Sequence, residues 1–302
     1  MNATPTVCIL MSTYNGCKYL HQQLDSIFSQ EDVNVKLIVR DDGSKDNTVE
    51  ILQEYKGIEI IKAPNVGCEE SFKELLYMPV EADYYAFADQ DDVWHPRKLI
   101  SAIESLTEHK CDLYVCNLML ADGEMKLQHP LFSDEDIRFY DYRMRNYILC
   151  NIHGCVQVWT KKLHQIIQTY KPQETQPHDV WVNAIANMVS KTYVDSNCYI
   201  NYRLHGNNTS GLATSTFDRV KKGIKLYVLS DRHHNDILCR QLLEGYGKFM
   251  DENDIRYHQL SLVADYKKNI IKKIKLLFSG TVTCSAFQHK WLYRFCILIN
   301  RY

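Results

Sequence analysis

The sequence predicts an α/β fold with a mainly parallel central sheet, followed by a helical C-terminal extension. In the first half of the 302-residue chain, short runs rich in β-branched residues alternate with segments that carry apolar residues at helical spacing. From Thr216 onward the helical spacing continues throughout. The hydrophobic content of 45% is sufficient for a full buried core. Together these features favour one large α/β domain with an appended helical segment.

The alternation of strand-like and helix-like segments begins near the N-terminus and predicts each secondary-structure element in turn. Runs of β-branched and aromatic residues predict strands at Thr6–Ser12, Val35–Arg40, Ile58–Lys62, Tyr84–Ala88 and Asp112–Cys116. Apolar residues three or four apart predict the intervening helices at Lys18–Ser29, Asp46–Tyr55, Glu69–Tyr77 and Arg97–Thr107. Crossover helices between successive strands are typical of a parallel sheet, and domains of this type commonly bind nucleotides.

After about residue 118 the alternation weakens into a mixed region, which we expect to recognise a second substrate. The pattern predicts a turn at Asp122-Gly123, a helix at Asp179–Val189, a strand pair around Thr192–Arg203 and a loop at His205-Gly206-Asn207-Asn208. We therefore expect a compact domain over residues 1–212, divided into a nucleotide-binding part (1–117) and an acceptor-side part (118–212). A helical, basic extension would cover residues 213–302.

Charge and cysteine usage narrow the class of protein. The formal net charge of -2 argues against nucleic-acid binding, because neutralising phosphates requires a basic excess. The eleven cysteines stand singly in apolar runs, as Cys8 and Cys116 do, which indicates small core residues in a reducing cytoplasm. No basic region followed by a long apolar stretch marks the N-terminus, so no export is expected.

The last part of the chain is locally basic. Residues 264–302 hold eight Lys or Arg against the single acid Asp265, interleaved with Ile, Leu, Phe and Trp. Two interpretations are open. The segment is either a helix with a solvated basic face that packs on the domain, or an amphipathic tail on an anionic membrane face. The second would place the protein peripherally at the inner face of the plasma membrane.

A strand that stops at three carboxylates is the most informative segment. The apolar run Tyr84–Ala88 is followed directly by Asp89, Asp91 and Asp92. Ligands bind at the carboxyl ends of strands in open α/β sheets, and clustered carboxylates there call for a cation. Oxygen ligands favour Mg²⁺ or Mn²⁺, so Asp89 and Asp91 are predicted metal ligands. The alternative is capping of the helix near Pro96, which suits Asp92 best because one helix needs one cap.

Two further predicted strands end in polar side chains that would share the same crevice. The first ends at Ser12-Thr13-Tyr14-Asn15-Gly16 and the second at Asp41-Asp42-Gly43-Ser44. Asp41 would accept hydrogen bonds from a base nitrogen or a ribose hydroxyl, and Tyr14 would pack on the base. Asn-Gly and Asp-Gly are also common turn dipeptides, and that interpretation is open for either segment alone.

The chain resembles glycosyltransferase family 2 over about residues 5–210. The resemblance rests on four motifs in the family's order and spacing: Ser12-Thr13-Tyr14-Asn15, Asp41-Asp42-Gly43-Ser44, Asn65-Val66-Gly67 and Asp89-Gln90-Asp91-Asp92-Val93-Trp94. The last of these is similar to the form found in the bacterial branch that includes rhamnosyltransferases of surface polysaccharide synthesis.

The resemblance implies a GT-A fold, a nucleotide-sugar donor, Mn²⁺ or Mg²⁺ at the acidic motif, and inversion at the anomeric carbon. It implies nucleotide contacts for Thr13, Tyr14, Asn15 and Asp41, and contacts with ribose, diphosphate and metal for Asp89 and Asp91. Asn65 and Gly67 correspond to a loop near the nucleotide, although Asn-x-Gly also suits a plain turn.

The resemblance also implies a catalytic base and further contacts on the leaving group. Asp179 corresponds to the base on the acceptor side, which takes the proton of the attacking hydroxyl. His178 stands where many family members have Glu, and the alternative for Asp179 is a helix N-cap. Arg203 would hold diphosphate oxygens, and His205 would reach the metal or a phosphate.

The expected reaction is therefore inverting, metal-dependent transfer from a dTDP-, UDP- or GDP-sugar to a glycan or lipid-linked glycan of a bacterial surface polysaccharide. The resemblance to the branch that includes rhamnosyltransferases makes rhamnose the expected donor sugar. Two alternatives are a sugar nucleotidyltransferase and an inactive glycan-binding or assembly subunit. The first would need a Gly-rich triphosphate loop followed by Arg or Lys, which Ser12–Gly16 lacks. The intact acids Asp89, Asp91 and Asp179 count against the second.

Overall fold

A computed structural model describes residues 3–138, 141, 148, 150, 152–205, 235–279 and 290–302. Its strands are β1 (Thr6–Thr13), β2 (Asn34–Asp41), β3 (Ile58–Lys62), β4 (Tyr84–Ala88), β5 (Val93–Trp94), β6 (Leu113–Ala121), β7 (Leu127–Pro130), β8 (Gln157–Thr160) and β9 (Thr192–Arg203). The α-helices of the first part are α1 (Leu20–Phe28), α2 (Thr48–Glu54), α3 (Cys68–Leu76), α4 (Lys98–Glu108), α6 (Lys161–Ile167) and α7 (His178–Val189). Those of the last part are α9 (Asn235–Tyr246), α10 (Ile255–Asp265), α11 (Ile270–Phe278) and α12 (Lys290–Leu298), and two short 3₁₀ helices are η1 (Gly154–Val156) and η3 (Gly247–Phe249).

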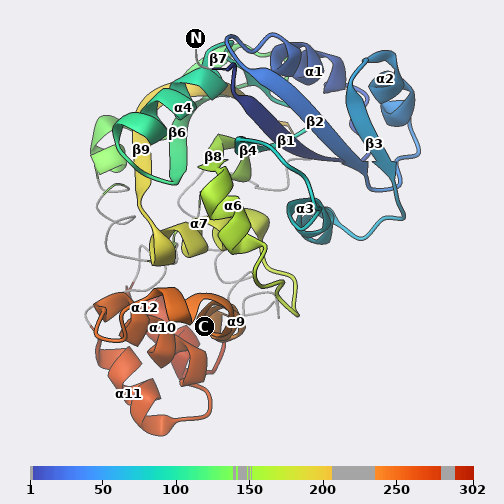
Figure 1. Cartoon of the computed structure of the whole chain (residues 1–302). Helices are drawn as coiled ribbons and strands as arrows, with labels where there is room; N and C mark the ends of the chain where they lie inside the picture. Colours follow the sequence, from blue (N-terminus) through green and yellow to red (C-terminus); the bar gives the residue numbers. More distant parts are fainter. Residues whose placement is uncertain are drawn as a thin grey trace.

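The nine described strands form one sheet in the order β3-β2-β1-β4-β8-β6-β9-β5, with β7 paired to β6 (Figure 1). The strands β3, β2, β1 and β4 pair in parallel. Strand β8 is antiparallel to both β4 and β6, so β6 runs with the first four strands, and β9 is parallel to β6. Six of the nine strands therefore share one direction, which confirms the predicted mainly parallel α/β sheet.

The central strands β1 and β4 are buried on both faces, which is why they consist of continuous apolar runs. In β1 all five residues of Val7–Met11 are buried, although successive side chains point to opposite faces. Cys8 and Cys116 are buried within such runs, as expected for small core residues. Every cysteine that the structure describes is a free thiol.

The predicted elements of the first half are confirmed within one or two residues at most ends. The strand predicted at Asp112–Cys116 is longer and continues as β6 to Ala121, because its second half is also buried. The predicted strand pair around Thr192–Arg203 is wrong. This segment is the single strand β9, whose register against β6 shifts on either side of Asn117. The register shifts interrupt the alternation that marks a continuous strand, and the sequence therefore suggests two strands.

The described C-terminal helices pack against the acceptor-side part of the chain. The hydroxyl of Tyr246 in α9 donates to the backbone oxygens of Ile167 and Tyr170 at 2.8 and 2.9 Å. Its ring lies edge-on to Trp181 of α7. Arg256 of α10 donates to the backbone oxygen of Asn187 at 2.7 Å. The predicted helical extension is thus present over 235–279 and 290–302, whereas the proposed boundary at residue 212 lies outside the described residues.

One aromatic cluster joins α7 to the N-terminal half. The ring of His178, the first residue of α7, stacks on Phe72 of α3 with 3.9 Å between ring centroids, and it lies edge-on to Phe87 of β4 at 4.7 Å. Burial lowers the pKa of His178 to about 3, so the ring is neutral. A Cβ atom on Gly154 of η1 would lie 2.4 Å from Nε2 of His178. Only a glycine at position 154 leaves room for this packing.

Substitution of that glycine is expected to destabilise the fold. In Gly154→Ala the new methyl group meets a ring held by two phenylalanines, so we expect the free energy of unfolding to fall by about 1–3 kcal/mol in urea denaturation. Gly123→Ala is the control, because the nearest atom to its added Cβ is 3.8 Å away. We expect a change of at most about 0.5 kcal/mol for the control. Similar small losses in both variants would contradict this account of the cluster.

Candidate active site

A cavity of about 860 Å³ opens at the carboxyl ends of the parallel strands. One wall comes from segments that follow β1, β2, β3 and β4, and the opposite wall comes from residues around η1, the start of α7 and the end of β9. The volume is in the range of small-molecule sites. Strands from both halves of the domain therefore contribute to one cleft, as expected at the edge of an open α/β sheet.

Most of the residues predicted from the sequence meet in this cavity. Those that line it are Tyr14, Asn15, Asn65, Gly67, Asp89, Asp91, Asp179 and His205. Thr13, Asp41 and Arg203 are not among the lining residues, and each is almost fully buried. The loop residues Gly206, Asn207 and Asn208 lie outside the described residues.

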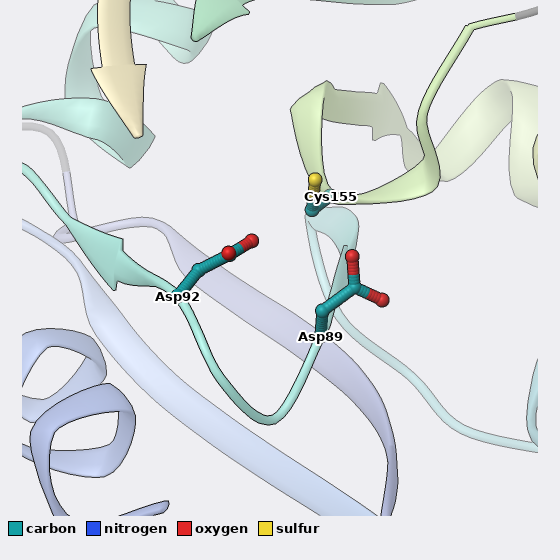
Figure 2. A group of neighbouring side chains, drawn as sticks. All are labelled: Asp89, Asp92 and Cys155. Atoms are coloured by element: carbon teal, nitrogen blue, oxygen red, sulfur yellow. The ribbon is translucent and has the colours of Figure 1, made fainter. Parts of the chain in front are cut away.

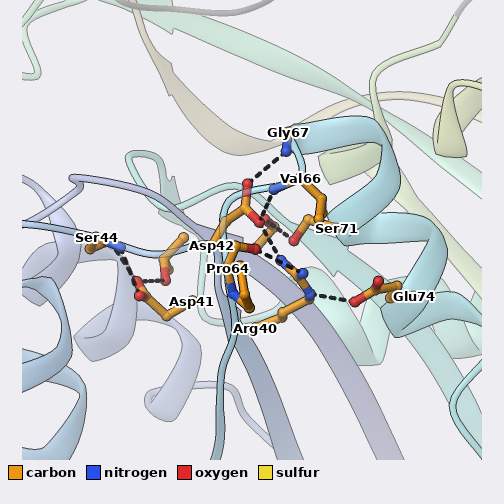
Figure 3. Close-up of polar contacts among 11 residues, drawn as sticks. Arg40, Asp41, Asp42, Ser44, Pro64, Val66, Gly67, Ser71 and Glu74 are labelled. Atoms are coloured by element: carbon orange, nitrogen blue, oxygen red, sulfur yellow. Dashed lines mark hydrogen bonds and ion pairs between the residues drawn. The ribbon is translucent and has the colours of Figure 1, made fainter.

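A buried ion pair holds the loop that contains Asn65 and Gly67 (Figure 3). The guanidinium of Arg40 donates to a carboxylate oxygen of Asp42 and, at 2.6 Å, to Glu74. Asp42 accepts from the backbone N–H groups of Val66 and Gly67, both at 2.9 Å. Gly67 has φ +89°, a left-handed conformation that favours glycine. Asp42, for which the sequence predicted no role, both fixes this loop and lines the cavity.

The predicted nucleotide residues Thr13 and Asp41 bond to each other behind the cavity wall. The Thr13 hydroxyl donates to Asp41 Oδ2 at 3.0 Å. Asp41 also accepts from the backbone N–H of Ser44 at 2.9 Å and from its hydroxyl at 2.6 Å (Figure 3). Ser44 in turn accepts from the backbone N–H of Asn15 at 2.9 Å. These bonds hold the ends of β1 and β2 together, and a direct nucleotide contact of Asp41 stays a prediction.

Gln90 is a site residue that sequence analysis missed. Its side-chain amide accepts from the backbone N–H of Tyr14 at 2.9 Å and donates to the backbone oxygen of Tyr14 at 3.2 Å. A Cβ atom on Gly16 would lie 2.2 Å from Gln90 Oε1, so the glycine allows this approach. The only signal in the sequence was its position between Asp89 and Asp91, where the carboxylates dominated the interpretation.

The acidic loop after β4 places two carboxyl groups beside a thiol (Figure 2). Ligand atoms of Asp89, Asp92 and Cys155 lie within 4.8 Å of one another. Burial, with added repulsion from Asp91 and Asp179, raises the pKa of Asp89 to about 7. Burial and the neighbouring carboxylates raise the pKa of Asp92 well above its usual range. Neither Asp92 nor Cys155 lines the cavity, so both lie behind the wall that Asp89 forms.

The alternative that these acids cap the next helix is wrong. Helix α4 begins at Lys98, its N-cap is Arg97, and no side chain provides a cap hydrogen bond. Asp92 instead accepts from the backbone N–H of Arg203 at 3.1 Å, while its other oxygen has no hydrogen-bond partner in the described structure. The acidic loop is therefore part of the site and not of the helix end.

Asp91 and His205 form the part of the site whose side chains best fit a divalent cation. Nε2 of His205 lies 2.7 Å from Oδ2 of Asp91, and each side chain is 16% exposed. Asp89 lines the same cavity. Carboxylate oxygens suit Mg²⁺ and Mn²⁺, and an imidazole nitrogen shifts the preference toward Mn²⁺. Burial favours the protonated forms of clustered carboxylates. A bound cation would favour their ionised forms instead. The donor set therefore fits the expected metal.

Arg203 supports this pair from behind. Its Nε donates to the backbone oxygen of Asp91 at 2.9 Å, Nη1 donates to the backbone oxygen of Gly123 at 2.6 Å, and Nη2 donates to the side chain of Gln22. The backbone N–H of Arg203 also donates a hydrogen bond to Asp92. Arg203 therefore joins the end of β9 to the acidic loop. The predicted contact of Arg203 with diphosphate oxygens stays a prediction, because these hydrogen bonds describe a positioning role.

Lys18 supplies a cation that does line the cavity and that sequence analysis did not single out. Its Nζ lies 4.7 Å from the ring centroid of Tyr19. The Tyr19 ring also lies beneath the guanidinium of Arg203, at 4.3 Å, and 5.2 Å from the ring of His205. Lys18 is thus connected through Tyr19 to His205, one of the candidate metal ligands.

Asp179 stands at the opposite wall, in the first turn of α7. The N-cap of α7 is Pro177, so the alternative that Asp179 is the N-cap is wrong. Its Oδ1 accepts from the backbone N–H of Val180 at 2.7 Å, and its backbone oxygen accepts from Gln157 at 3.0 Å. Burial raises the pKa of Asp179 to about 6, and Glu69 adds to the rise. A half-buried carboxylate with this pKa is suited to accept a proton near neutral pH.

Comparison with known proteins places the chain among the glycosyltransferases. The family model of Glycosyl transferase family 2 matches residues 8–166, more than half of the chain. The dTDP-rhamnosyl transferase RfbG of Shigella flexneri is 29% identical over 230 residues, which are 70% of this chain and 77% of RfbG. An uncharacterized glycosyltransferase of Rickettsia prowazekii, RP339, is 25% identical over 282 residues, 88% of this chain and 87% of the relative. The putative teichuronic acid biosynthesis glycosyltransferase TuaG of Bacillus subtilis is 27% identical over 218 residues, 69% of this chain and 83% of TuaG.

Solved structures agree in fold. The S. aureus TarS fragment in complex with UDP-GlcNAc superposes with a TM-score of 0.56 at 17% identity, covering 90% of this chain and 84% of that one. The mannosyltransferase PcManGT of Pyrobaculum calidifontis, in complex with GDP-Man and Mn²⁺, superposes with a TM-score of 0.56 at 11% identity, covering 99% and 88%. At these identities the likeness concerns the fold alone. With the family match, the chain belongs to glycosyltransferase family 2 and is a glycosyltransferase with the GT-A fold.

Proposed function

We propose that the enzyme transfers a sugar from a nucleotide diphosphate donor to a glycan hydroxyl, with inversion at the anomeric carbon and with a divalent metal. The observation that supports this most strongly is the cavity itself. The Asp91–His205 pair and Asp179 line this one cavity, and they come from different segments: the pair from the loops after β4 and β9, and Asp179 from the first turn of α7. The cavity therefore contains both groups suited to a leaving diphosphate and a group suited to an incoming hydroxyl. Family membership argues against the nucleotidyltransferase alternative, and the paired acids argue against an inactive subunit.

On the donor side, the loop ends of the parallel strands would hold the nucleotide. Tyr14 is 45% exposed at the cavity and is available to pack on a base. Asn15 and the Asn65–Gly67 loop lie beside it on the same wall. Thr13 and Asp41 would act through the hydrogen bonds that hold these strand ends.

Asp89, Asp91 and His205 would hold Mn²⁺ or Mg²⁺. When bound, the metal would neutralise negative charge on the departing diphosphate. Arg203 would keep the Asp91 backbone in place for this task, and Lys18 would contact the phosphates directly. Fixed cationic groups at the leaving group stabilise the transition state without reorganisation.

On the acceptor side, Asp179 would act as the general base. The acceptor oxygen forms a bond to the anomeric carbon as the bond from that carbon to the diphosphate oxygen breaks, and the hydroxyl proton passes to the Asp179 carboxylate. A single displacement of this kind inverts the anomeric centre. His178, with its ring packed between Phe72 and Phe87, would set the start of α7 and thereby the position of Asp179.

The relatives guide the proposal for substrates. RfbG is a dTDP-rhamnosyl transferase and TuaG a putative teichuronic acid enzyme, so a dTDP-sugar such as dTDP-rhamnose and a surface polysaccharide acceptor, of O-antigen or capsule type, are proposed first. UDP- and GDP-sugars remain in the proposal because the TarS and PcManGT structures contain donors with those nucleotides. No helix among the described residues is long and apolar enough to cross a membrane. Peripheral membrane contact through residues 264–302 is also proposed.

Nucleotide binding should depend on the metal and on Asp91. We expect calorimetry with dTDP, UDP and GDP to show binding of one nucleotide with Mn²⁺, weakened at least about tenfold by chelator or by Asp91→Asn. Glu104→Gln, which removes an exposed carboxylate from α4, is the control and should bind as the unmodified protein does. Nucleotide binding that is equally tight with chelator would contradict the metal-dependent proposal.

The turnover number should fall when Asp179 loses its base function. We expect Asp179→Asn to lower kcat by about 10²–10⁴-fold while nucleotide affinity is retained. Because the base acts in its deprotonated form and its pKa is about 6, activity should decline as the pH falls through about 6. Glu69→Gln is the matched control, since Glu69 lines the same cavity. A larger loss in Glu69→Gln than in Asp179→Asn would assign the base to Glu69.

Lys18 and Arg203 should differ in how they affect nucleotide binding. A direct phosphate contact predicts that Lys18→Gln weakens nucleoside diphosphate binding both with Mn²⁺ and with chelator. A positioning role predicts that Arg203→Lys weakens only the Mn²⁺-dependent part, because the three donors of a lysine share one nitrogen and do not reproduce the spread of the guanidinium toward three separate acceptors. Calorimetry under the two conditions separates the roles. Equal weakening by Arg203→Lys in both conditions would instead support a direct phosphate contact of Arg203.

A further inference from the structure

Helix α11 exposes its apolar face. Ile270, Ile271, Ile274 and Phe278 are 68%, 63%, 49% and 79% exposed. Their spacing of one, three and four residues places them on one side of the helix. In Figure 1 α11 lies at the opposite end of the molecule from the sheet. These four residues are called the α11 stripe below.

The stripe faces outward because the opposite side of the helix is bonded to the protein. Lys272 donates to Asp265 at 2.6 Å and to the hydroxyl and backbone oxygens of Ser261 at 3.1 and 3.3 Å. Lys273 donates to the backbone oxygen of Leu298 and to the side chain of Asn300, both at 2.9 Å. Two lysines thus point inward while three isoleucines point outward. This is the reverse of the usual arrangement of a surface helix.

The N-terminus of α11 is also secured. The side chain of Asn269 accepts from the backbone N–H groups of Ile271 and Lys272, at 3.0 and 3.1 Å. Leu276, on the inward side, is buried. The cap, the lysine bonds and this buried leucine hold the helix in one orientation. The exposure of the stripe is therefore a property of the packed helix.

Basic side chains surround this apolar surface. Lys268 and Lys275 are exposed beside the stripe, and Arg294 is exposed on α12, which packs against α11. The acid of this region, Asp265, is bonded to Lys272. Phe295 and Leu298 of α12 add two further exposed apolar side chains, at 44% and 57%. An apolar surface flanked by cations complements a bilayer whose headgroups are anionic.

We propose that the α11 stripe inserts into the anionic face of a lipid bilayer, with Lys268 and Lys275 at the level of the headgroups. A nine-residue helix is too short to span a membrane, and it would lie in the interface plane at a depth of about 5–10 Å. This contact would hold the enzyme at the surface in which a lipid-linked acceptor is embedded. The inference does not depend on the proposed donor, metal or base, because membrane binding is measured without catalysis.

The test is co-sedimentation of the full chain with phosphatidylcholine vesicles, with and without about 30 mol% phosphatidylglycerol. We expect binding to the anionic vesicles and at least a tenfold weaker binding, roughly, for the double variant Ile271→Gln/Ile274→Gln. Lys268→Gln/Lys275→Gln should weaken binding by about fivefold for each lysine and reduce its dependence on salt. Circular dichroism and thermal unfolding should be unchanged, since all four side chains are exposed.

Ile255→Gln is the matched control. Ile255 is 65% exposed, almost as Ile271 is, but it begins α10 between Asp254 and Arg256. Its replacement should leave vesicle binding unchanged. Equal effects of the control and the stripe variant would overturn the proposal, as would absence of binding to anionic vesicles. Sedimentation velocity tests whether the unmodified chain associates with itself. If it does, and if Ile271→Gln/Ile274→Gln abolishes this self-association, the stripe would instead be a contact with a second copy of the chain.

Discussion

Mutual repulsion among the carboxylates after β4 is the constraint on which the rest of the site depends. Asp89, Asp91 and Asp92 lie within four residues, and burial adds to the free energy of ionising Asp89 and Asp92. The fold compensates with hydrogen bonds from outside the loop: His205 to the carboxylate of Asp91, and the backbone N–H of Arg203 to Asp92. Both partners come from the end of β9, more than a hundred residues later. The long parallel pairing of β9 with β6 is therefore what makes an acidic loop tolerable in this position.

The two walls of the cavity are held by different kinds of interaction. The donor wall depends on hydrogen bonds and a buried ion pair, in which Arg40 and Asp42 fix the loop that contains Asn65 and Gly67. The acceptor wall depends on packing, in which His178 of α7 contacts Phe72 and Phe87 of the N-terminal half. Polar networks define positions closely, which suits recognition of a nucleotide. Apolar packing tolerates exchange of side chains of similar volume, which suits a wall that differs among enzymes with different acceptors.

The described C-terminal helices are attached to the part of the chain that is proposed to receive the acceptor. Tyr246 and Arg256 bond to backbone oxygens at the ends of α6 and α7, and α7 also carries Asp179. Helix α11 lies beyond these contacts, at the end of the molecule away from the sheet (Figure 1). A bilayer contact at the stripe would thus act on the part of the enzyme that is proposed to receive the acceptor. This connection is continuous packing through α9 and α7, and we assign no conformational change to it.

The sequence by itself determined the α/β class, most element boundaries of the first half and the residues that gather at the strand ends. Periodicity and the location of residues at the carboxyl ends of strands are local properties, and they sufficed to predict Tyr14, Asp89 and Asp91 as site residues, whereas Asn65 was predicted from the family resemblance. Only the tertiary structure decided which polar residues face the cavity. Asp41 and Arg203 are buried in hydrogen bonds to partners that no local pattern reveals, whereas Lys18 and Gln90 face the cavity. It also decided the outward orientation of α11, because contacts of Lys272 and Lys273 with distant residues outweigh the hydrophobic pattern of that helix.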